Sequence, residues 1–159
     1  HRREDLRQGK VPPDAYLVPG TRALLEALKA RGLKMYCASG TDQGYTREEA
    51  RLLDLERYFD GEVYGALDDY KSFSKDILIR RIIATAQCRG DEFLGFGDGY
   101  VEIKNVKEVG GVAVGVATAE PECRVVDEWK RKRLVGVGAD FIIPNFLCQE
   151  QLLGTLFPQ

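Results

Sequence analysis

The sequence has few of the residues on which several kinds of site depend. Its single histidine, His1, is terminal, and its four cysteines form no Cys-x-x-Cys pair. This argues against a zinc site and against a Cys–His nucleophile pair. No apolar run reaches the roughly 18 residues of a membrane span, and no signal-peptide pattern occurs. We therefore expect no membrane association, and scattered cysteines in apolar segments favour the reducing cytoplasm.

A strong charge of either sign is absent as well. The 159 residues include 23 basic and 25 acidic side chains, a net charge of −2, with 44% hydrophobic and 30% charged residues. This balance predicts an ordinary globular core and gives no reason to expect nucleic-acid binding. The only dense basic stretch, Lys130–Arg133, is interpreted as a solvated helix face.

An initiator methionine is missing, since the only methionine is Met35. The chain begins with the charged residues His1–Asp5 and continues through Pro12-Pro13. We expect residues 1–15 to be a tail or the end of a cap linker, and residues 16–159 to form a core domain. We also expect the chain to be cut from a longer protein.

Helical and extended patterns alternate along the rest of the chain. Leucines recur at helical spacing in residues 21–31, Thr46–Glu49 is a capping box, and Val112–Ala117 resembles a strand buried on both faces. The alternation predicts an α/β fold, a three-layer sandwich around a mostly parallel sheet. Helices are predicted over 21–31, 46–53, 55–59, 75–88, 101–109, 127–135 and 149–156, and strands over 33–38, 61–66, 93–97, 112–117 and 141–143.

One stretch joins a predicted strand to two acids. Phe93–Gly97 is apolar and runs into the glycine-flanked Asp98, and Glu102 follows in the first turn of the next predicted helix. Open α/β sheets bind ligands at the carboxyl ends of their strands. Two carboxylates at this spacing suit a hard cation such as Mg²⁺. Asp98 is equally suited to be the N-cap of the helix, and this alternative stays open.

Two further polar features fall at predicted strand ends or helix starts. Ser39-Gly40-Thr41 follows the predicted strand 33–38, where a hydroxyl and backbone amides can hold a phosphate oxygen. Lys75 starts a helix that Ser74 can cap, and its charge suits a phosphate. Either feature alone fits an ordinary turn or a solvated lysine. In this order, together with Asp98, they indicate phosphoryl transfer.

These motifs resemble those of the haloacid dehalogenase-like hydrolases, in the branch of phosphatases that carry a cap. The resemblance covers roughly residues 16–145 and extends to the segments beside the motifs. The similar segments are Val18–Thr21 (after the cap), Ser39-Gly40 (second motif), Ser74–Asp76 (third motif), Gly97–Glu102 (fourth motif) and Gly110–Val116 (the strand that follows).

The resemblance implies a Rossmann-like core and a Mg²⁺-dependent phosphatase that acts on a small phosphorylated metabolite through a phospho-aspartate. As implied catalytic residues, Ser39 would bind the transferring phosphoryl group beside the Gly40 amide, and Lys75 would steady the nucleophile and the phosphate. Asp98 would be a metal ligand. Glu102 would hold the metal directly or through water, at a position where aspartate is common in the family.

The chain departs from the family at the first motif, an Asp-x-Asp pair at the end of an apolar strand. Asp5 and Asp14 follow no such strand, and Asp68-Asp69 lies after Ser39 and lacks the spacing. Without a carboxylate nucleophile, covalent catalysis has no attacking group. We therefore predict that this chain alone is not a competent phosphatase.

The same departure concerns the sheet. In the family the missing strand lies between those corresponding to 33–38 and 93–97, so we expect two strand edges that are open to association. Alternative interpretations are a non-catalytic module for regulation or assembly, Lys71 in the role of Lys75, and a generic nucleotide binder. The last is weak because Phe96–Gly99 lacks the full G-x-G-x-x-G pattern.

Overall fold

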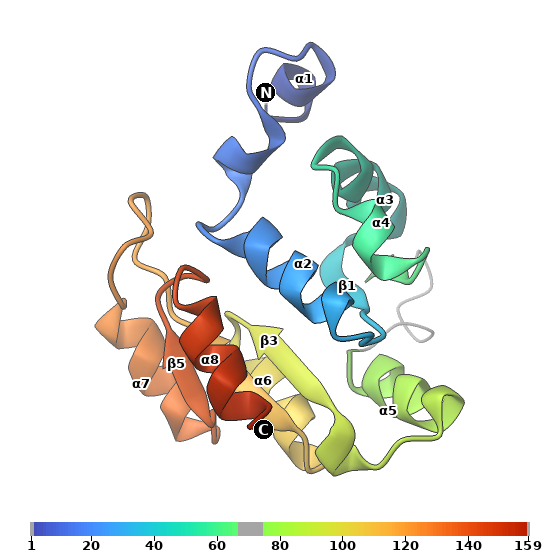
Figure 1. Ribbon diagram of the computed structural model, residues 1–159, viewed down its shortest axis with the longest axis vertical. Coiled ribbons are helices and arrows are strands. Elements are labelled where there is room, and N and C mark those ends of the chain that lie inside the picture. Colours follow the sequence, from blue (N-terminus) through green and yellow to red (C-terminus); the bar gives the residue numbers. More distant parts are fainter. Residues whose placement is uncertain (1, 67–74, 159) are drawn as a thin grey trace. The chain divides into compact units, whose positions relative to one another are not determined.

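The computed structural model describes residues 2–66 and 75–158 (Figure 1). The chain divides into two compact units, one of residues 1–72 with 146–159 and the other of residues 73–145. Each unit has its own parallel sheet and its own apolar cluster, and each is considered by itself.

The first unit is a two-stranded parallel sheet with helices packed on it. Strand β1 pairs with β2, and helix α3 packs on both strands. The apolar cluster is built from Ala50 of α3, Tyr58 and Phe59 of α4, and Val63 of β2. The elements are α1 (Arg2–Arg7), η1 (Pro13–Tyr16), α2 (Thr21–Ala30), β1 (Cys37–Asp42), α3 (Gln43–Leu52), α4 (Glu56–Phe59), β2 (Val63–Ala66) and α8 (Gln149–Leu156).

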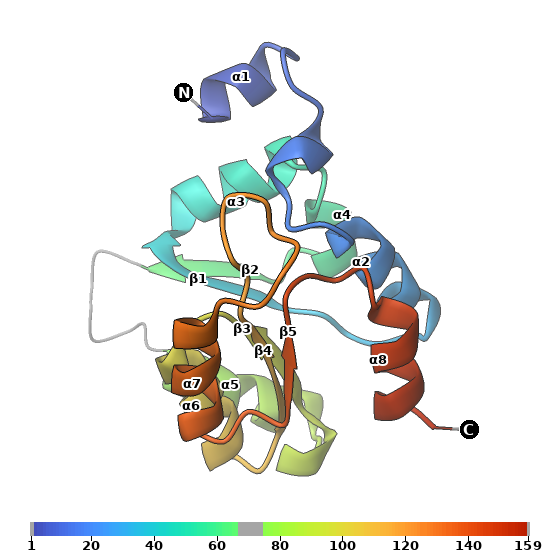
Figure 2. The same ribbon diagram turned by 90° about the vertical axis from the view of Figure 1, so that its left-hand side faces the viewer.

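The second unit is a three-stranded parallel sheet in the order β3-β4-β5, visible side by side in Figure 2. Helix α6 packs on β3 and β4 and is flanked by α5 and α7. Ile103 of α6 and Ala113 of β4, both fully buried, lie in its core. The elements are α5 (Lys75–Ala86), η2 (Gly90–Glu92), β3 (Leu94–Gly97), α6 (Tyr100–Glu108), β4 (Val112–Val116), α7 (Glu128–Gly136) and β5 (Phe141–Ile143).

Most predicted elements are confirmed to within a residue or two. Helix α8 and strand β5 have the predicted bounds, and α2 ends at Ala30, before Gly32 with φ 76°. Strand β4 is a nearly continuous apolar run with four of its five residues buried, as the pattern indicated. These segments were predictable because each has a strong apolar period and a clear stop signal.

The prediction for the first strand was wrong. Residues 33–36 are not a strand, and β1 instead begins at Cys37, whose amide donates to the Glu62 carbonyl at 3.0 Å. The reason is the partner strand: the chain turns at Asp60 and Gly61, which have φ values of 48° and 83°. No β2 residue is therefore available to pair with the segment before Cys37. Ser39-Gly40-Thr41, predicted as the loop after the strand, lies within β1.

The predicted start of the next helix was also wrong. Helix α3 begins at Gln43, and its N-cap is Asp42, whose carboxylate accepts a hydrogen bond of 3.2 Å from the Tyr45 amide. Thr46, the first residue of the predicted capping box, lies inside the helix, and its hydroxyl donates back to the Asp42 carbonyl at 3.0 Å. Asp42, which is the last residue of β1, caps the helix instead of the predicted capping box.

The apolar residues of helix α5 predict an inward face of Ile77, Leu78, Ile82, Ile83 and Ala86, and this prediction was partly wrong. Leu78 and Ile82 are buried as expected, but Ile77 is 43% exposed and Ile79 is buried in its place. Ala86 is exposed rather than inward. The packing of α5 against α6 decides which side of this apolar helix is covered, because isoleucines occur on more than one of its sides.

The described strands form two separate sheets, and β1 is not hydrogen-bonded to β3. Within the described residues β3 pairs only with β4, and β1 only with β2. No helix among the described residues combines the length and apolar composition needed to cross a membrane.

Candidate functional site

An ion pair between the first turns of α5 and α6 is the centre of the candidate site in the second unit. The Lys75 ammonium donates to the Glu102 carboxylate, and the two side chains are only 22% and 29% exposed. The sequence placed both residues in the site but did not predict that they bind each other. The missed signal was their shared position at helix starts on one edge of a parallel sheet.

Gly97, the last residue of β3, makes room for this pair. A Cβ built on Gly97 would lie 2.7 Å from Oε2 and 3.2 Å from Cβ of Glu102. Any side chain at this position would therefore displace the Glu102 carboxylate. The lack of a side chain at residue 97 lets the acid of α6 pack against the end of the strand.

Asp98 follows at the carboxyl end of β3, in the bend that leads into α6. The N-cap of α6 is Gly99, with no side-chain cap hydrogen bond, so the interpretation of Asp98 as the N-cap was wrong. Asp98 is exposed, and among the described residues it makes no hydrogen bond or ion pair. Its carboxylate is thus able to accept a ligand.

The donor set at this edge suits a hard cation only in part. Asp98 offers a carboxylate, and Glu102 offers the oxygen that Lys75 does not occupy. No group of three or more acids, histidines or cysteines gathers among the described residues to form an all-protein cage. Mg²⁺ does not need such a cage, because it keeps several waters and is bound through one or two carboxylates.

Ser39 and Gly40 lie in the first unit, where β1 departs from regular pairing with β2. Ala38 faces Tyr64 and Asp42 faces Ala66, with an irregularity between them. The Ser39 hydroxyl oxygen accepts a hydrogen bond of 3.1 Å from the Thr41 amide, and Gly40 is exposed. This segment is irregular in its pairing, although it is part of a strand.

The predicted site residues therefore belong to two units. Lys75 and Glu102 pair beside Gly97 at the end of β3, where Asp98 is the next residue, and Ser39 and Gly40 lie within β1. Thr46, predicted only as the start of a capping box, and Gly65 lie against the Thr41 carbonyl and were not predicted to belong to the site. The alternative lysine Lys71, the acids Asp68-Asp69 and the cap Ser74 lie outside the described residues.

Comparison with known proteins identifies the family. A family model described as haloacid dehalogenase-like hydrolase matches residues 6–110, more than half of the chain. The chain belongs to this family. The matched range contains Ser39, Lys75, Asp98 and Glu102, and the family that the motifs resembled is confirmed.

Two sequence relatives are named as a phosphatase and a nucleotidase. A phosphorylated carbohydrates phosphatase of Thermotoga maritima is 45% identical over 47 residues, which are 30% of this chain and 22% of the relative. A 5'-nucleotidase of Pseudomonas aeruginosa is 30% identical over 97 residues, 61% of this chain and 43% of the relative. The chain thus spans less than half the length of each.

Solved structures show the same fold. A predicted phosphatase from Clostridium acetobutylicum has a TM-score of 0.68 at 19% identity, over 89% of this chain and 60% of that protein. A putative β-phosphoglucomutase from Thermotoga maritima has a TM-score of 0.66 at 26% identity, over 87% and 58%. The predicted fold class, an α/β Rossmann-like sandwich with parallel strands, is confirmed.

Proposed function

We propose that this chain supplies the phosphate-binding and metal-binding groups of a Mg²⁺-dependent phosphatase that acts on a small phosphorylated metabolite through a phospho-aspartate. The observation that carries the proposal is the convergence of Lys75, Glu102 and Asp98 at the carboxyl end of β3. The family match and the phosphatase names of relatives support the reaction class. We also propose a cytoplasmic location, consistent with the absence of any disulfide among the four cysteines.

Each residue has a proposed role. Ser39 and the Gly40 amide bind the transferring phosphoryl group, and Lys75 neutralises negative charge on the nucleophile and the phosphate. Asp98 is the metal ligand, and Glu102 holds Lys75 with one oxygen while the other faces the metal or its water. Bound Mg²⁺ supplies charge stabilisation for the phosphoryl oxygens. The carboxylate nucleophile is absent from the sequence, so the chain lacks the attacking group.

The metal-binding part is tested by titrating the purified chain with Mg²⁺ and following the backbone amides of residues 97–103 by NMR. We expect saturable shifts for the wild type and binding weaker by on the order of tenfold to hundredfold for Asp98→Asn, since the amide carries no charge. Asp98 is exposed and makes no hydrogen bond or ion pair among the described residues, so this change should leave the fold intact.

Asp91→Asn is a matched control. Asp91 is an exposed acid at the opposite end of β3, where it pairs with Arg89 at 3.0 Å. The Asp91→Asn variant should bind Mg²⁺ with the same affinity as the wild type. Equal affinity of Asp98→Asn and the wild type, or no residue-specific shifts in the wild type, would overturn the assignment of Asp98 as the ligand.

A further inference from the structure

The segment Ser39-Gly40-Thr41 is held in place by two residues that have no assigned role. We infer that Gly65 and Thr46 are positioning residues that fix this segment in the shape that binds an anion. The inference rests on the proposed function of Ser39 and Gly40 as the phosphoryl-binding pair. It is confined to the first unit, where all the contacts occur.

The strand register shows that the segment is forced out of regular pairing. Between the pairs Ala38–Tyr64 and Asp42–Ala66, three residues of β1 face the single residue Gly65 of β2. A bulge of this kind turns backbone groups away from the ladder. It therefore redirects the backbone groups of Ser39 and Gly40 within the strand.

Gly65 allows the bulge to approach β2 closely. A Cβ at residue 65 would lie 2.5 Å from the Thr41 carbonyl oxygen, 2.7 Å from Gln43 Cα and 2.8 Å from Thr46 Oγ1. Two of these three atoms are backbone, so a side chain could not be admitted by a rotamer change alone. Gly65 is not among the positive-φ glycines, so its φ is open to other residues. The requirement for glycine at residue 65 is steric.

Thr46 fastens the bulge from the side of α3. Its side chain is buried, and its hydroxyl lies 3.2 Å from the Thr41 carbonyl and 3.0 Å from the Asp42 carbonyl. The Thr41 amide donates in turn to the Ser39 hydroxyl oxygen at 3.1 Å. The single Thr46 hydroxyl proton is shared between the Thr41 and Asp42 carbonyls, so contacts to the Thr41 carbonyl and to the Thr41 amide hold the segment beside Gly40.

This arrangement leaves the groups of the proposed anion site available. The Ser39 oxygen accepts from Thr41, so its hydroxyl proton remains to be donated to a phosphate oxygen. Space beside Gly40 is open, because a Cβ there would meet nothing within 4 Å. A ligand can therefore approach the bulge at Gly40 while Gly65 and Thr46 support it from behind.

The test is a titration of the 159-residue chain with inorganic phosphate, read residue by residue from the amide shifts of residues 39–42, at ionic strength matched with chloride. In Gly65→Ala the Thr41 carbonyl must retreat, and we expect phosphate binding to weaken by about tenfold or more, because a displacement near 1 Å is enough to cost such a factor. Thr46→Val removes the hydroxyl with little change in volume and should weaken binding less. Thr46→Ser should restore it.

Gly154→Ala is the matched control, because residue 154 lies on α8 of the same unit with nothing within 4 Å of the added Cβ. Unchanged phosphate affinity in both Gly65→Ala and Thr46→Val would overturn the inference, even if the variants unfold at lower temperature, since a purely structural role predicts that pattern. If Gly65→Ala does not fold, the comparison of phosphate affinity between Thr46→Val and Thr46→Ser decides whether the inference holds. Absence of residue-specific binding in the wild type would instead overturn the proposed function of Ser39 and Gly40.

Discussion

Two glycines with no need for positive φ make room for polar groups at strand ends. Gly97 admits the Glu102 carboxylate, and Gly65 admits the Thr41 carbonyl and the Thr46 hydroxyl. In both cases the atom that occupies the space belongs to, or contacts, a proposed site residue. The space left by each glycine is therefore filled by a polar group beside a proposed site residue, and it is visible only through what lies next to the glycine.

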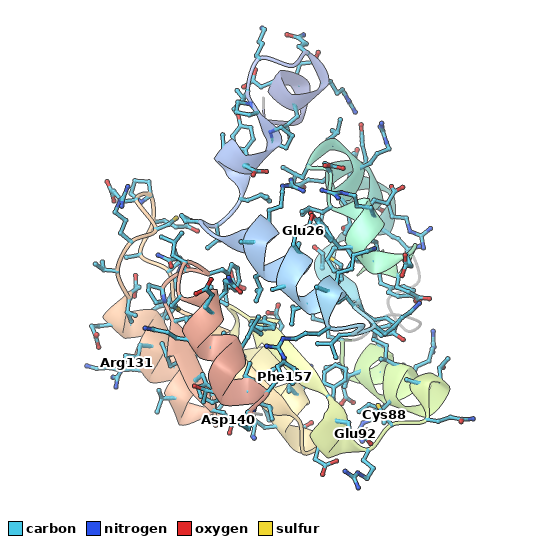
Figure 3. All side chains as sticks on the ribbon, in the orientation of Figure 1. Glu26, Cys88, Glu92, Arg131, Asp140 and Phe157 are labelled. Atoms are coloured by element: carbon cyan, nitrogen blue, oxygen red, sulfur yellow. The ribbon has the colours of Figure 1, made fainter. Side chains whose placement is uncertain are left out.

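A second feature at the scale of single residues is the Asp140 carboxylate, which lies just before β5 and binds the start of β4. Asp140, labelled in Figure 3, accepts a hydrogen bond of 2.8 Å from the Ala113 amide and one of 2.9 Å from Lys107. Partial burial by itself would raise the pKa of this carboxyl, but the bonds from Ala113 and Lys107 outweigh burial and lower the pKa below its ordinary value of 3.8. The ionised form is thus favoured in the folded state.

The lowered pKa predicts how stability depends on pH. The contribution of Asp140 is fully present above the unfolded value near 3.8 and disappears as pH falls through the lower folded value. We expect Asp140→Asn to cost about 1 kcal/mol at pH 7, since a charge-assisted bond to the Ala113 amide is weakened. The difference from the wild type should vanish at acid pH. Urea unfolding at several pH values measures this, and a constant difference down to pH 2 would contradict it.

Among the elements, the ends of helices are fixed by groups from elsewhere in the chain. Arg22 of α2 donates to the carbonyls of Leu53 and Asp54, both at 2.7 Å, where α3 ends. Its Nε also donates to Asp14 at 2.9 Å, which ties η1 to the same point. A single guanidinium therefore joins three elements of the first unit, and this role has no local signature in the sequence.

Removing this guanidinium should destabilise the first unit. We expect Arg22→Met, which keeps the aliphatic stem, to lower the free energy of unfolding by about 2–3 kcal/mol, because it leaves the two carbonyls and the Asp14 carboxylate without their donor. Arg51→Met, at an exposed position in the last turn of α3, is the control. Chemical denaturation measures both variants, and equal stability of the two would show that Arg22 is not a structural link.

The basic residues Lys130–Arg133 of α7 make several contacts within the second unit. Lys130 donates to the Thr118 carbonyl at 2.9 Å, and Arg131, labelled in Figure 3, pairs with Glu128 at 3.7 Å. The Arg133 guanidinium lies 4.6 Å from the centre of the Trp129 ring. The face is mostly exposed, as predicted, but its charges are largely engaged with their own unit.

For the whole molecule, the described strands form two parallel sheets, one in each unit. Among the described residues, β1 is hydrogen-bonded only to β2, and β3 only to β4. We propose that these strand edges are open to association with a further strand. The carboxylate nucleophile and the strand that carries it would then come from outside these residues.

This leads to a prediction about activity. The purified chain should not hydrolyse p-nitrophenyl phosphate with Mg²⁺ above the rate of the Asp98→Asn variant, because its sequence has no Asp-x-Asp pair after an apolar strand to supply the nucleophile. A colorimetric assay at high protein concentration checks this. Robust hydrolysis that Asp98→Asn abolishes would show that another group acts as the nucleophile. Binding of phosphate and Mg²⁺ without hydrolysis agrees with a site that has its phosphate-binding and metal-binding groups but lacks the nucleophile. It agrees also with a regulatory module.

Much of the secondary structure could be predicted from the sequence where local signals agreed. Residues 93–102 combine an apolar strand, a glycine-flanked acid and a helix start, and β3 and α6 occur within a residue of their predicted bounds. The failures share one cause, which is competition from a neighbour that is distant in sequence. The turn at Asp60 and Gly61 shortened the first strand, and Asp42 displaced the predicted cap.

By itself, the sequence determined the fold class, the family and the order of the motif residues, because apolar periodicity and motif spacing are properties of the chain. Only the tertiary structure decided that Lys75 binds Glu102, that Gly97 and Gly65 give space to polar groups, and that Asp98 is left without a partner among the described residues. These facts depend on contacts between segments far apart in the chain. Such contacts form when side chains pack, and no local pattern encodes them.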